Sequence, residues 1–185
     1  MAATRDTHAV TIAGLDRELP LFEVRPGLRI AVLNILGDVA LVRAAAAALA
    51  DRLAGTAFDA IVTPETKSVP LAHELAAATD RPYAVLRKSY KTYMGDALAL
   101  QTESITTGVE QHLYLDEKDA ALVRGRPVLL LDDVVSTGST LQGMRQLMRR
   151  AGADIAAVAA IATEGEPGDW RDVVALTHLP LFLDT

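Results

Sequence analysis

The chain has 185 residues, half of them hydrophobic, which predicts one domain with a sizeable aliphatic core and excludes a disordered chain. The net charge of −6, from 18 Lys and Arg against 24 Asp and Glu, argues against nucleic acid or an anionic membrane as the partner. The absence of cysteine excludes disulfides, thiol catalysis and thiolate-bound zinc. The sequence shows neither a signal-peptide pattern nor an apolar run of about 20 residues, so we expect a cytoplasmic protein.

The N-terminal part is expected to lie at the edge of the core. Alternation over residues 10–12, followed by a charged run with prolines over 16–26, predicts an edge hairpin or a cover. A strand is expected over 29–36, and Gly37 and Asp38 then supply a turn and a helix N-cap. The alanine-rich segment 39–53 predicts a helix.

The order of strand, loop and helix then repeats. The predicted strands lie over 59–63, 83–86, 112–115, 128–131 and 155–162, with a last short one within 173–182. The predicted helices lie over 70–78 and 140–150. The polar segment 87–110 is long enough for a functional or mobile loop. This alternation predicts an α/β fold, with residues 1–185 in a single domain whose central sheet is mainly parallel and flanked by helices.

The most informative stretch is VLLLDDVVSTGST, residues 128–140. A buried strand leads into Asp132 and Asp133, and a small turn then opens a helix, where free backbone N–H groups and the helix dipole favour a phosphate. Gly138 allows close approach of the backbone. The hydroxyl groups that can add donors belong to Ser136, Thr137, Ser139 and Thr140.

The two aspartates are expected to act on a sugar. Carboxylates about one ribose away from a bound 5′-phosphate can accept hydrogen bonds from the ring hydroxyls and stabilise positive charge on the ring. In the alternative interpretation, the acids only end a strand and the hydroxyl residues only cap a helix. Two adjacent acids directly after four aliphatic residues make little structural sense unless they are used. The stretch matches neither a Walker loop nor a Gly-x-Gly-x-x-Gly fingerprint.

This stretch resembles the phosphoribosyl-diphosphate (PRPP) binding motif of the type I phosphoribosyltransferases. From about Leu28 to Phe182 the order of elements is similar to that of the adenine phosphoribosyltransferase type, as are the Arg87-Lys88 pair and the ending over 174–182. The resemblance implies the type I fold, with a small hood from about residues 1–36 and 163–185. It also implies purine salvage, in which the 5-phosphoribosyl group moves from PRPP to a purine base and pyrophosphate leaves.

The resemblance assigns roles to individual residues. The 5′-phosphate of PRPP is expected on Ser136, Thr137, Gly138, Ser139 and Thr140. The pyrophosphate group is expected against Glu65, Thr66, Lys67, Arg87, Lys88 and Lys91. Mg²⁺ is expected with the diphosphate, held mainly by PRPP, and the candidates for direct contact with it are Asp132 and Asp133. For the basic residues, the alternative is a solvated charged surface.

The sequence departs from the adenine enzymes at three places. Lys67-Ser68 stands where they commonly have arginine and glycine, so the charge stays but the bidentate fork is lost. Thr107, before Gly108, stands in place of a loop glutamate that acts on the base. The substitutes for that glutamate are Glu103, which we place with Asp132 and Asp133 in the catalytic set, and Glu110, although a glutamate of this kind is more often just a solvated loop carboxylate.

The third departure concerns the base. Leu33 stands near a stacking phenylalanine of the adenine enzymes, and Leu33 and Asn34 are the expected base contacts. Adenine is the first expectation, and a 6-oxopurine such as xanthine or hypoxanthine is the second. A module that binds PRPP without turnover is the alternative from another functional class. We also expect a homodimer, and for Trp170 a structural role or a place at the rim of the site.

Overall fold

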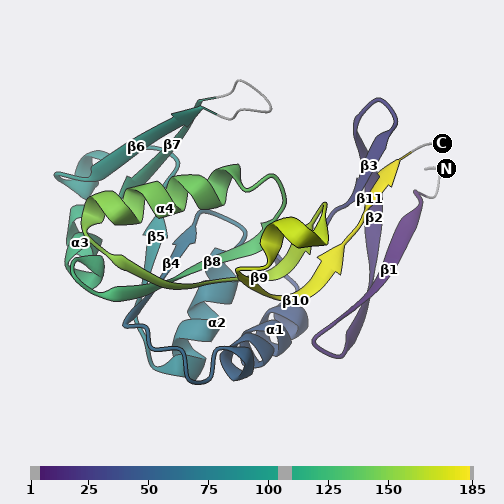
Figure 1. Ribbon diagram of the computed structural model, residues 1–185, viewed down its shortest axis with the longest axis horizontal. Coiled ribbons are helices and arrows are strands. Elements are labelled where there is room, and N and C mark those ends of the chain that lie inside the picture. Colours follow the sequence, from purple (N-terminus) through teal and green to yellow (C-terminus); the bar gives the residue numbers. More distant parts are fainter. Residues whose placement is uncertain (1–4, 104–109, 184–185) are drawn as a thin grey trace.

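The computed structural model describes residues 5–103 and 110–183. Within them, five parallel strands form the central sheet, in the order β10, β9, β8, β4, β5 (Figure 1). Their bounds are Ala60–Pro64 for β4, Tyr83–Leu86 for β5, Pro127–Val135 for β8, Asp154–Glu164 for β9 and Val173–Leu179 for β10. The predicted α/β fold with a mainly parallel sheet is therefore confirmed.

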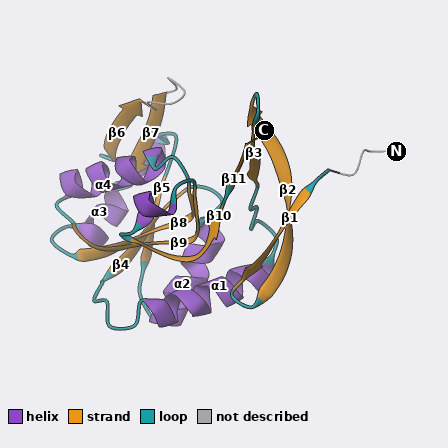
Figure 2. Ribbon diagram, turned by 45° about the vertical axis from the view of Figure 1, so that its right-hand side comes forward, coloured by secondary structure: helices purple, strands orange, loops and turns teal. Residues whose placement is uncertain are grey.

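Helices cover both faces of this sheet. Helices α1 (Val39–Arg52) and α2 (Val69–Thr79) pack on one face, and α3 (Glu117–Val123) and α4 (Ser139–Ala151) lie on the other (Figure 2). Two apolar clusters result, one on each face, built mostly from aliphatic side chains. Across residues 5–103 and 110–183, none of the helices combines the length and the apolar character that a bilayer crossing demands.

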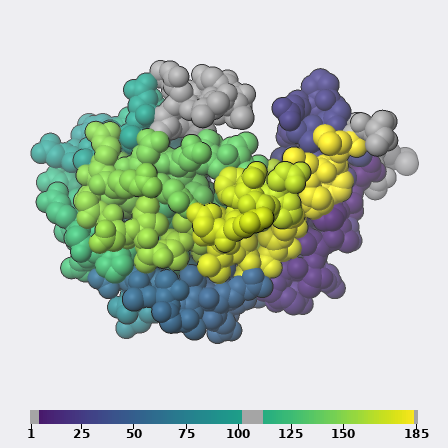
Figure 3. Space-filling view, viewed as in Figure 1, coloured from purple at the N-terminus to yellow at the C-terminus, as the bar shows by residue number. Residues whose placement is uncertain are grey.

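A second, antiparallel sheet forms the hood at one end of the molecule. It contains β1 (Thr7–Ile12), β2 (Leu15–Arg25), β3 (Leu28–Ala31) and β11 (Leu181–Leu183), in that order. Arg17 of β2 contacts both carboxylate oxygens of Asp38, at 2.7 and 3.0 Å. Asp38 also accepts from the N–H of Leu41, as the predicted N-cap of α1 should. In the space-filling view the turn between β2 and β3 stands out as a lobe next to the C-terminal strand β11 (Figure 3).

The order of the strands creates a crevice between β4 and β8. These strands are parallel neighbours, but β4 leads into α2 on one face and β8 leads into α4 on the other. The two loops therefore diverge at the carboxyl ends of the strands. In open α/β sheets this switch point is the place where ligands bind.

Several predicted elements differ from the structure. The strand expected over 29–36 ends at Ala31, and Leu33 and Ile35 are buried without a strand ladder, because an apolar alternation reports burial and not pairing. The segment expected as a loop over 87–110 contains a 3-10 turn, η1 (Thr92–Met94), and β6 (Leu98–Glu103). Strand β6 pairs with β7 (Glu110–Leu115) in an antiparallel hairpin outside the central sheet. Helix α3 has only seven residues, and we did not predict it.

Candidate active site

A pocket opens at the crevice between β4 and β8. Its lining comes from the ends of these two strands, the loop after β4, the residue after Arg87, and the start of α4. The residues are Pro64, Glu65, Thr66, Lys67, Ser68, Lys88, Asp132, Asp133, Val134 and Thr140. Two cations and three carboxylates predicted from the sequence therefore meet in one pocket, although they lie on segments up to 68 positions apart.

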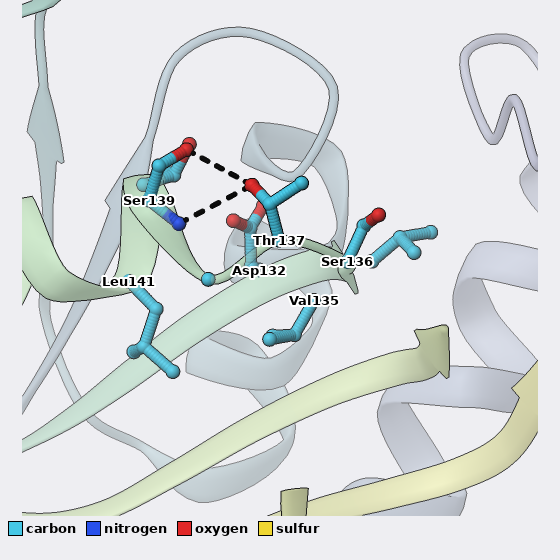
Figure 4. Close-up of a pocket in the computed structure, with 9 residues that line it drawn as sticks. Asp132, Val135, Ser136, Thr137, Ser139 and Leu141 are labelled. Carbon is cyan, nitrogen blue, oxygen red and sulfur yellow. Dashed lines mark hydrogen bonds between the residues drawn. The ribbon is translucent and has the colours of Figure 1, made fainter. Parts of the chain in front are cut away.

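An adjoining pocket forms around residues 136–138, called the phosphate loop from here on. It is lined by Asp132 and by residues 134–141. Figure 4 shows the hydroxyl groups of Thr137 and Ser139 on the same side as the Asp132 carboxylate, while Val135 and Leu141 point away. The Thr137 and Ser139 hydroxyl oxygens lie 3.2 Å apart.

The phosphate loop leaves the first turn of α4 open to an anion. Gly138 is the N-cap, so no side chain at that position can accept from the first N–H groups of the helix. The N–H of Ser139 has only a long contact of 3.5 Å with Thr137 Oγ1. An anion that accepts these N–H groups would also lie at the positive end of the helix dipole.

Asp132 and Asp133 lie within β8, rather than after it as the sequence suggested, because the strand continues to Val135. The Asp133 N–H donates to Asp132 Oδ1 at 2.9 Å. Asp133 is only 9% exposed, and Asp132 is half-buried. Burial, and then the Asp133 carboxylate beside it, raise the pKa of Asp132 to about 8, although the Lys88 ammonium opposes this shift.

This raised pKa predicts that Asp132→Asn stabilises the protein more as the pH rises. Because the folded-state pKa lies above the model value of 3.8, the native protein holds a proton that the unfolded chain has lost, so ionisation destabilises the fold progressively between about pH 4 and pH 8. Asparagine removes this penalty and keeps an acceptor oxygen for the Asp133 N–H. Since Asp132 is partly exposed, we expect only about 1 kcal/mol at pH 8, or about 2–4 °C in Tm.

Thermal unfolding of both proteins from pH 5 to pH 8.5 measures this effect. The matched control is Asp154→Asn, which replaces an exposed carboxylate at the start of β9 and should give a constant difference from wild type. A difference in Tm between Asp132→Asn and wild type that does not grow with pH would contradict the raised pKa.

The Glu65 side chain, which the sequence resemblance places against pyrophosphate, contacts Arg87 and Lys88 in the structure. Its carboxylate forms an ion pair with Arg87 Nε at 2.6 Å and accepts from the Lys88 N–H at 2.6 Å. A carboxylate used in this way joins the loop after β4 to the loop after β5. The Glu65 side chain thus holds the cationic segment beside the pocket, while Thr66 and Lys67 are exposed at its rim. The peptide bond between Glu65 and Thr66 is cis.

Ser68 fits the same loop closely. It is 1% exposed, accepts a hydrogen bond from Thr63 Oγ1 at 2.9 Å and donates to the Pro64 carbonyl oxygen at 2.9 Å. Its hydroxyl is therefore fully engaged within the loop. Ser68, where the sequence departs from the adenine pattern, lines the pocket, but its hydroxyl is used to hold the shape of the loop.

Other predicted residues lie elsewhere. Lys91 is exposed and does not line the pocket, and the Arg87 guanidinium is directed to Glu65. Leu33 is 3% exposed and belongs to the core, while Asn34 is exposed and accepts from the Leu36 N–H at 3.3 Å. Leu33 and Asn34 line a separate hollow against the hood.

The predicted acid or base falls partly outside the described residues. The backbone of Glu103 ends β6, but its side chain lies outside the described part of the structure, as does that of Glu110. Thr107 and Gly108 lie outside it entirely. The role of Glu103 stays a prediction.

Sequence reasoning missed one contact at the phosphate loop. The Ser136 hydroxyl donates to Oε1 of Glu164, a buried carboxylate at the end of β9. The expectation that this hydroxyl supplies a donor for phosphate therefore needs correction, because its hydrogen is already used. An acid at the end of a buried strand was the available signal for Glu164. It was the same signal that singled out Asp132 and Asp133.

Comparison with known proteins identifies the fold and the family. Residues 31–176 match the family model described as the phosphoribosyl transferase domain. Hypoxanthine/guanine phosphoribosyltransferases of Methanococcus vannielii and Methanocaldococcus vulcanius are 35% and 32% identical over 115 and 114 residues, which are 62% of this chain in both cases. The aligned part spans 58% and 57% of the length of these relatives.

Solved structures of adenine phosphoribosyltransferases share the architecture. The enzyme of Thermoanaerobacter pseudethanolicus has a TM-score of 0.66 at 18% identity, with 94% of this chain and 95% of that chain covered. The enzyme of Rhodothermus marinus has a TM-score of 0.65 at 21% identity, with 94% of both chains covered. These likenesses show the type I fold that the motif implied, and the match over residues 31–176 shows that the chain belongs to the phosphoribosyl transferase domain family.

Proposed function

We propose that the protein is a purine phosphoribosyltransferase, which transfers the 5-phosphoribosyl group from PRPP to a purine base and releases pyrophosphate. One observation carries the proposal. The open helix end at the phosphate loop, the paired carboxylates Asp132 and Asp133, and the cations Lys67 and Lys88 lie in two adjoining pockets at the switch point. Their order matches the order of groups along PRPP: phosphate, ribose, diphosphate.

In the proposed reaction each group has one task. Backbone N–H groups of residues 137–140 hold the 5′-phosphate. Asp132 and Asp133 accept hydrogen bonds from the ribose hydroxyls and, in their ionised forms, stabilise the positive charge that develops on the ring as the bond from C1′ to the diphosphate oxygen breaks. Because the pKa of Asp132 is raised to about 8, its share of this charge grows as the pH rises toward 8. The electron pair of that bond leaves with pyrophosphate, next to Lys67 and Lys88. A ring nitrogen of the base forms the new bond to C1′ and gives its proton to a base, for which Glu103 is the predicted candidate, or to water.

The donor set fits a magnesium ion shared with the substrate. In the part of the chain that the structure describes, no three His, Cys, Asp or Glu side chains gather into a metal-binding cluster. Asp132 and Asp133 are the residues that would hold the ion, together with the substrate. Bound in this way, Mg²⁺ would neutralise charge on the departing pyrophosphate.

Two kinds of purine are candidates for the acceptor. Adenine is the base expected from the sequence resemblance. The hypoxanthine/guanine activity named for relatives that are 32–35% identical over 62% of this chain favours a 6-oxopurine. The buried Leu33 also leaves no stacking side chain at that position for an adenine ring. The homodimer and the cytoplasmic location stay predictions.

A base panel tests the proposed function. Purified protein with Mg²⁺ and PRPP is offered adenine, hypoxanthine, guanine, xanthine, orotate and uracil separately, and nucleotide products are resolved by chromatography. We expect a nucleoside monophosphate and one equivalent of pyrophosphate with at least one purine, and none with orotate or uracil. A product with a pyrimidine alone would contradict the assignment. PRPP binding without turnover on any base would favour a PRPP-sensing module instead.

A further inference from the structure

One segment of the chain holds both ends of the phosphate loop. At the first residue of the loop, the Ser136 hydroxyl donates to Glu164 Oε1. At the last residue, Gly138 lies against the ring of Trp170, where an added Cβ would come within 2.6 Å of Cη2. Trp170 Nε1 in turn donates to the Glu164 carbonyl oxygen at 2.8 Å. Glu164 and Trp170 thus form one connected unit, called the clamp here.

The fold itself fixes the clamp. Glu164 ends β9, a strand of the central sheet, and is 5% exposed, and Trp170 ends the 3-10 turn η2 (Pro167–Trp170). The indole packs against the apolar cluster beneath α4. A buried carboxylate needs a hydrogen-bond donor, which the Ser136 hydroxyl supplies.

The clamp begins where the strand ladder ends. The last pair between β8 and β9 joins Val135 and Thr163, and the next residues along the two strands are Ser136 and Glu164. Beyond that pair, the hydrogen bond from the Ser136 hydroxyl to the Glu164 carboxylate connects the two chain segments. Gly138 has a φ of +76°, a conformation that side-chain-bearing residues adopt at an energetic cost, and its contact with the indole leaves no room for a side chain.

We propose that Glu164 and Trp170 are positioning residues that hold the phosphate loop in its anion-binding form, so that binding a phosphate monoester requires little reorganisation. This inference rests on the proposed function and concerns its 5′-phosphate subsite. Neither residue needs to touch the ligand. The clamp acts through Ser136 at one end of the loop and through Gly138 at the other.

Ribose 5-phosphate is the probe, because it occupies the phosphate and ribose positions without any chemistry. Glu164→Ala and Trp170→Ala are each expected to raise its Kd by about 10-fold, the equivalent of one lost hydrogen bond. Glu164→Gln is expected to bind at least as well as wild type, because the amide oxygen still accepts from Ser136 and a negative charge beside the phosphate is removed. The Kd of Trp170→Phe for ribose 5-phosphate should lie between the values for wild type and Trp170→Ala.

Steady-state kinetics separates positioning from general destabilisation. The alanine variants should raise the KM for PRPP with kcat little changed, because the bound substrate re-forms the loop. Val42→Ala is the matched control, since it truncates a side chain that is 4% exposed, in α1 on the opposite face of the sheet, and should leave Kd and KM unchanged. If an alanine variant fails to fold, Trp170→Phe carries the test.

The outcomes distinguish the inference from the proposed function. Wild-type affinity for ribose 5-phosphate in both alanine variants, or in Trp170→Phe where the alanine variant is unfolded, would overturn the clamp and leave the function standing. If Glu164→Gln loses as much affinity for ribose 5-phosphate as Glu164→Ala does, Glu164 does not act as the hydrogen-bond acceptor of Ser136. A wild-type protein that binds ribose 5-phosphate but makes no nucleotide would count against the proposed reaction alone. A wild-type protein that does not bind it would overturn both.

Discussion

Replacement of Asp132 and Asp133 together by asparagine should reduce turnover by at least about 100-fold while the protein stays folded, since groups that stabilise transition-state charge are each worth about that much. Asparagine has nearly the same shape and keeps an oxygen that can accept from the ribose hydroxyls. It cannot offer negative charge to the ring as the bond at C1′ breaks. The loss should therefore fall mainly on kcat.

The control for this variant removes two carboxylates of similar kind elsewhere. Asp51 and Asp154 are exposed and line neither pocket of the site, so the double asparagine variant at these positions should keep wild-type kinetics. Circular dichroism and thermal unfolding check the fold of both double variants. Wild-type turnover in the variant at positions 132 and 133 would show that the paired carboxylates of β8 are not used in the reaction.

The second large effect is expected from Gly138→Ala. The substitution places a side chain at a φ of +76°, which costs about 1–2 kcal/mol for an L residue. It also brings Cβ within 2.6 Å of the Trp170 ring, and overpacking of this kind costs about 1–3 kcal/mol more. Because the loop must move to relieve the contact, we expect kcat/KM for PRPP to fall at least about 10-fold, the equivalent of one hydrogen bond.

Gly14→Ala separates backbone strain from the contact with the indole. Gly14 has a φ of +79° in the turn between β1 and β2, and an added Cβ there would meet nothing within 4 Å. In Gly14→Ala the free energy of unfolding should fall only by the cost of the strained backbone, and the kinetics should match those of wild type. Denaturant unfolding and PRPP kinetics on both variants test this pair. Equal losses of stability in the two variants would contradict the packing of Trp170 on the phosphate loop.

The sequence was informative where one segment carries its own physical signals. The stretch over residues 128–140 predicts strand, turn and helix because its aliphatic run, its glycine and its hydroxyl residues act locally, and the structure has those elements. The helix after Asp38 follows from its cap and its alanine content in the same way. The parallel sheet follows from the alternation of strands and helices.

The sequence was less informative where a contact joins distant segments. Nothing near Glu65 in the sequence shows that its carboxylate pairs with Arg87, which lies 22 positions further along the chain. The link between Ser136 and Glu164 depends on the pairing of β8 with β9. Strand β6 was missed because the segment around it is polar and because it pairs in a hairpin outside the core sheet. Local patterns carry no information about such partners.

The crystal structure of the protein with PRPP and Mg²⁺ tests the central claim most directly. We expect the 5′-phosphate at the N–H groups of residues 137–140, the ribose hydroxyls at Asp132 and Asp133, and the diphosphate beside Lys67 and Lys88. We also expect Ser136 to donate to Glu164 when the ligand is bound. A diphosphate held elsewhere, or a phosphate loop left empty at saturating PRPP, would contradict the proposed function.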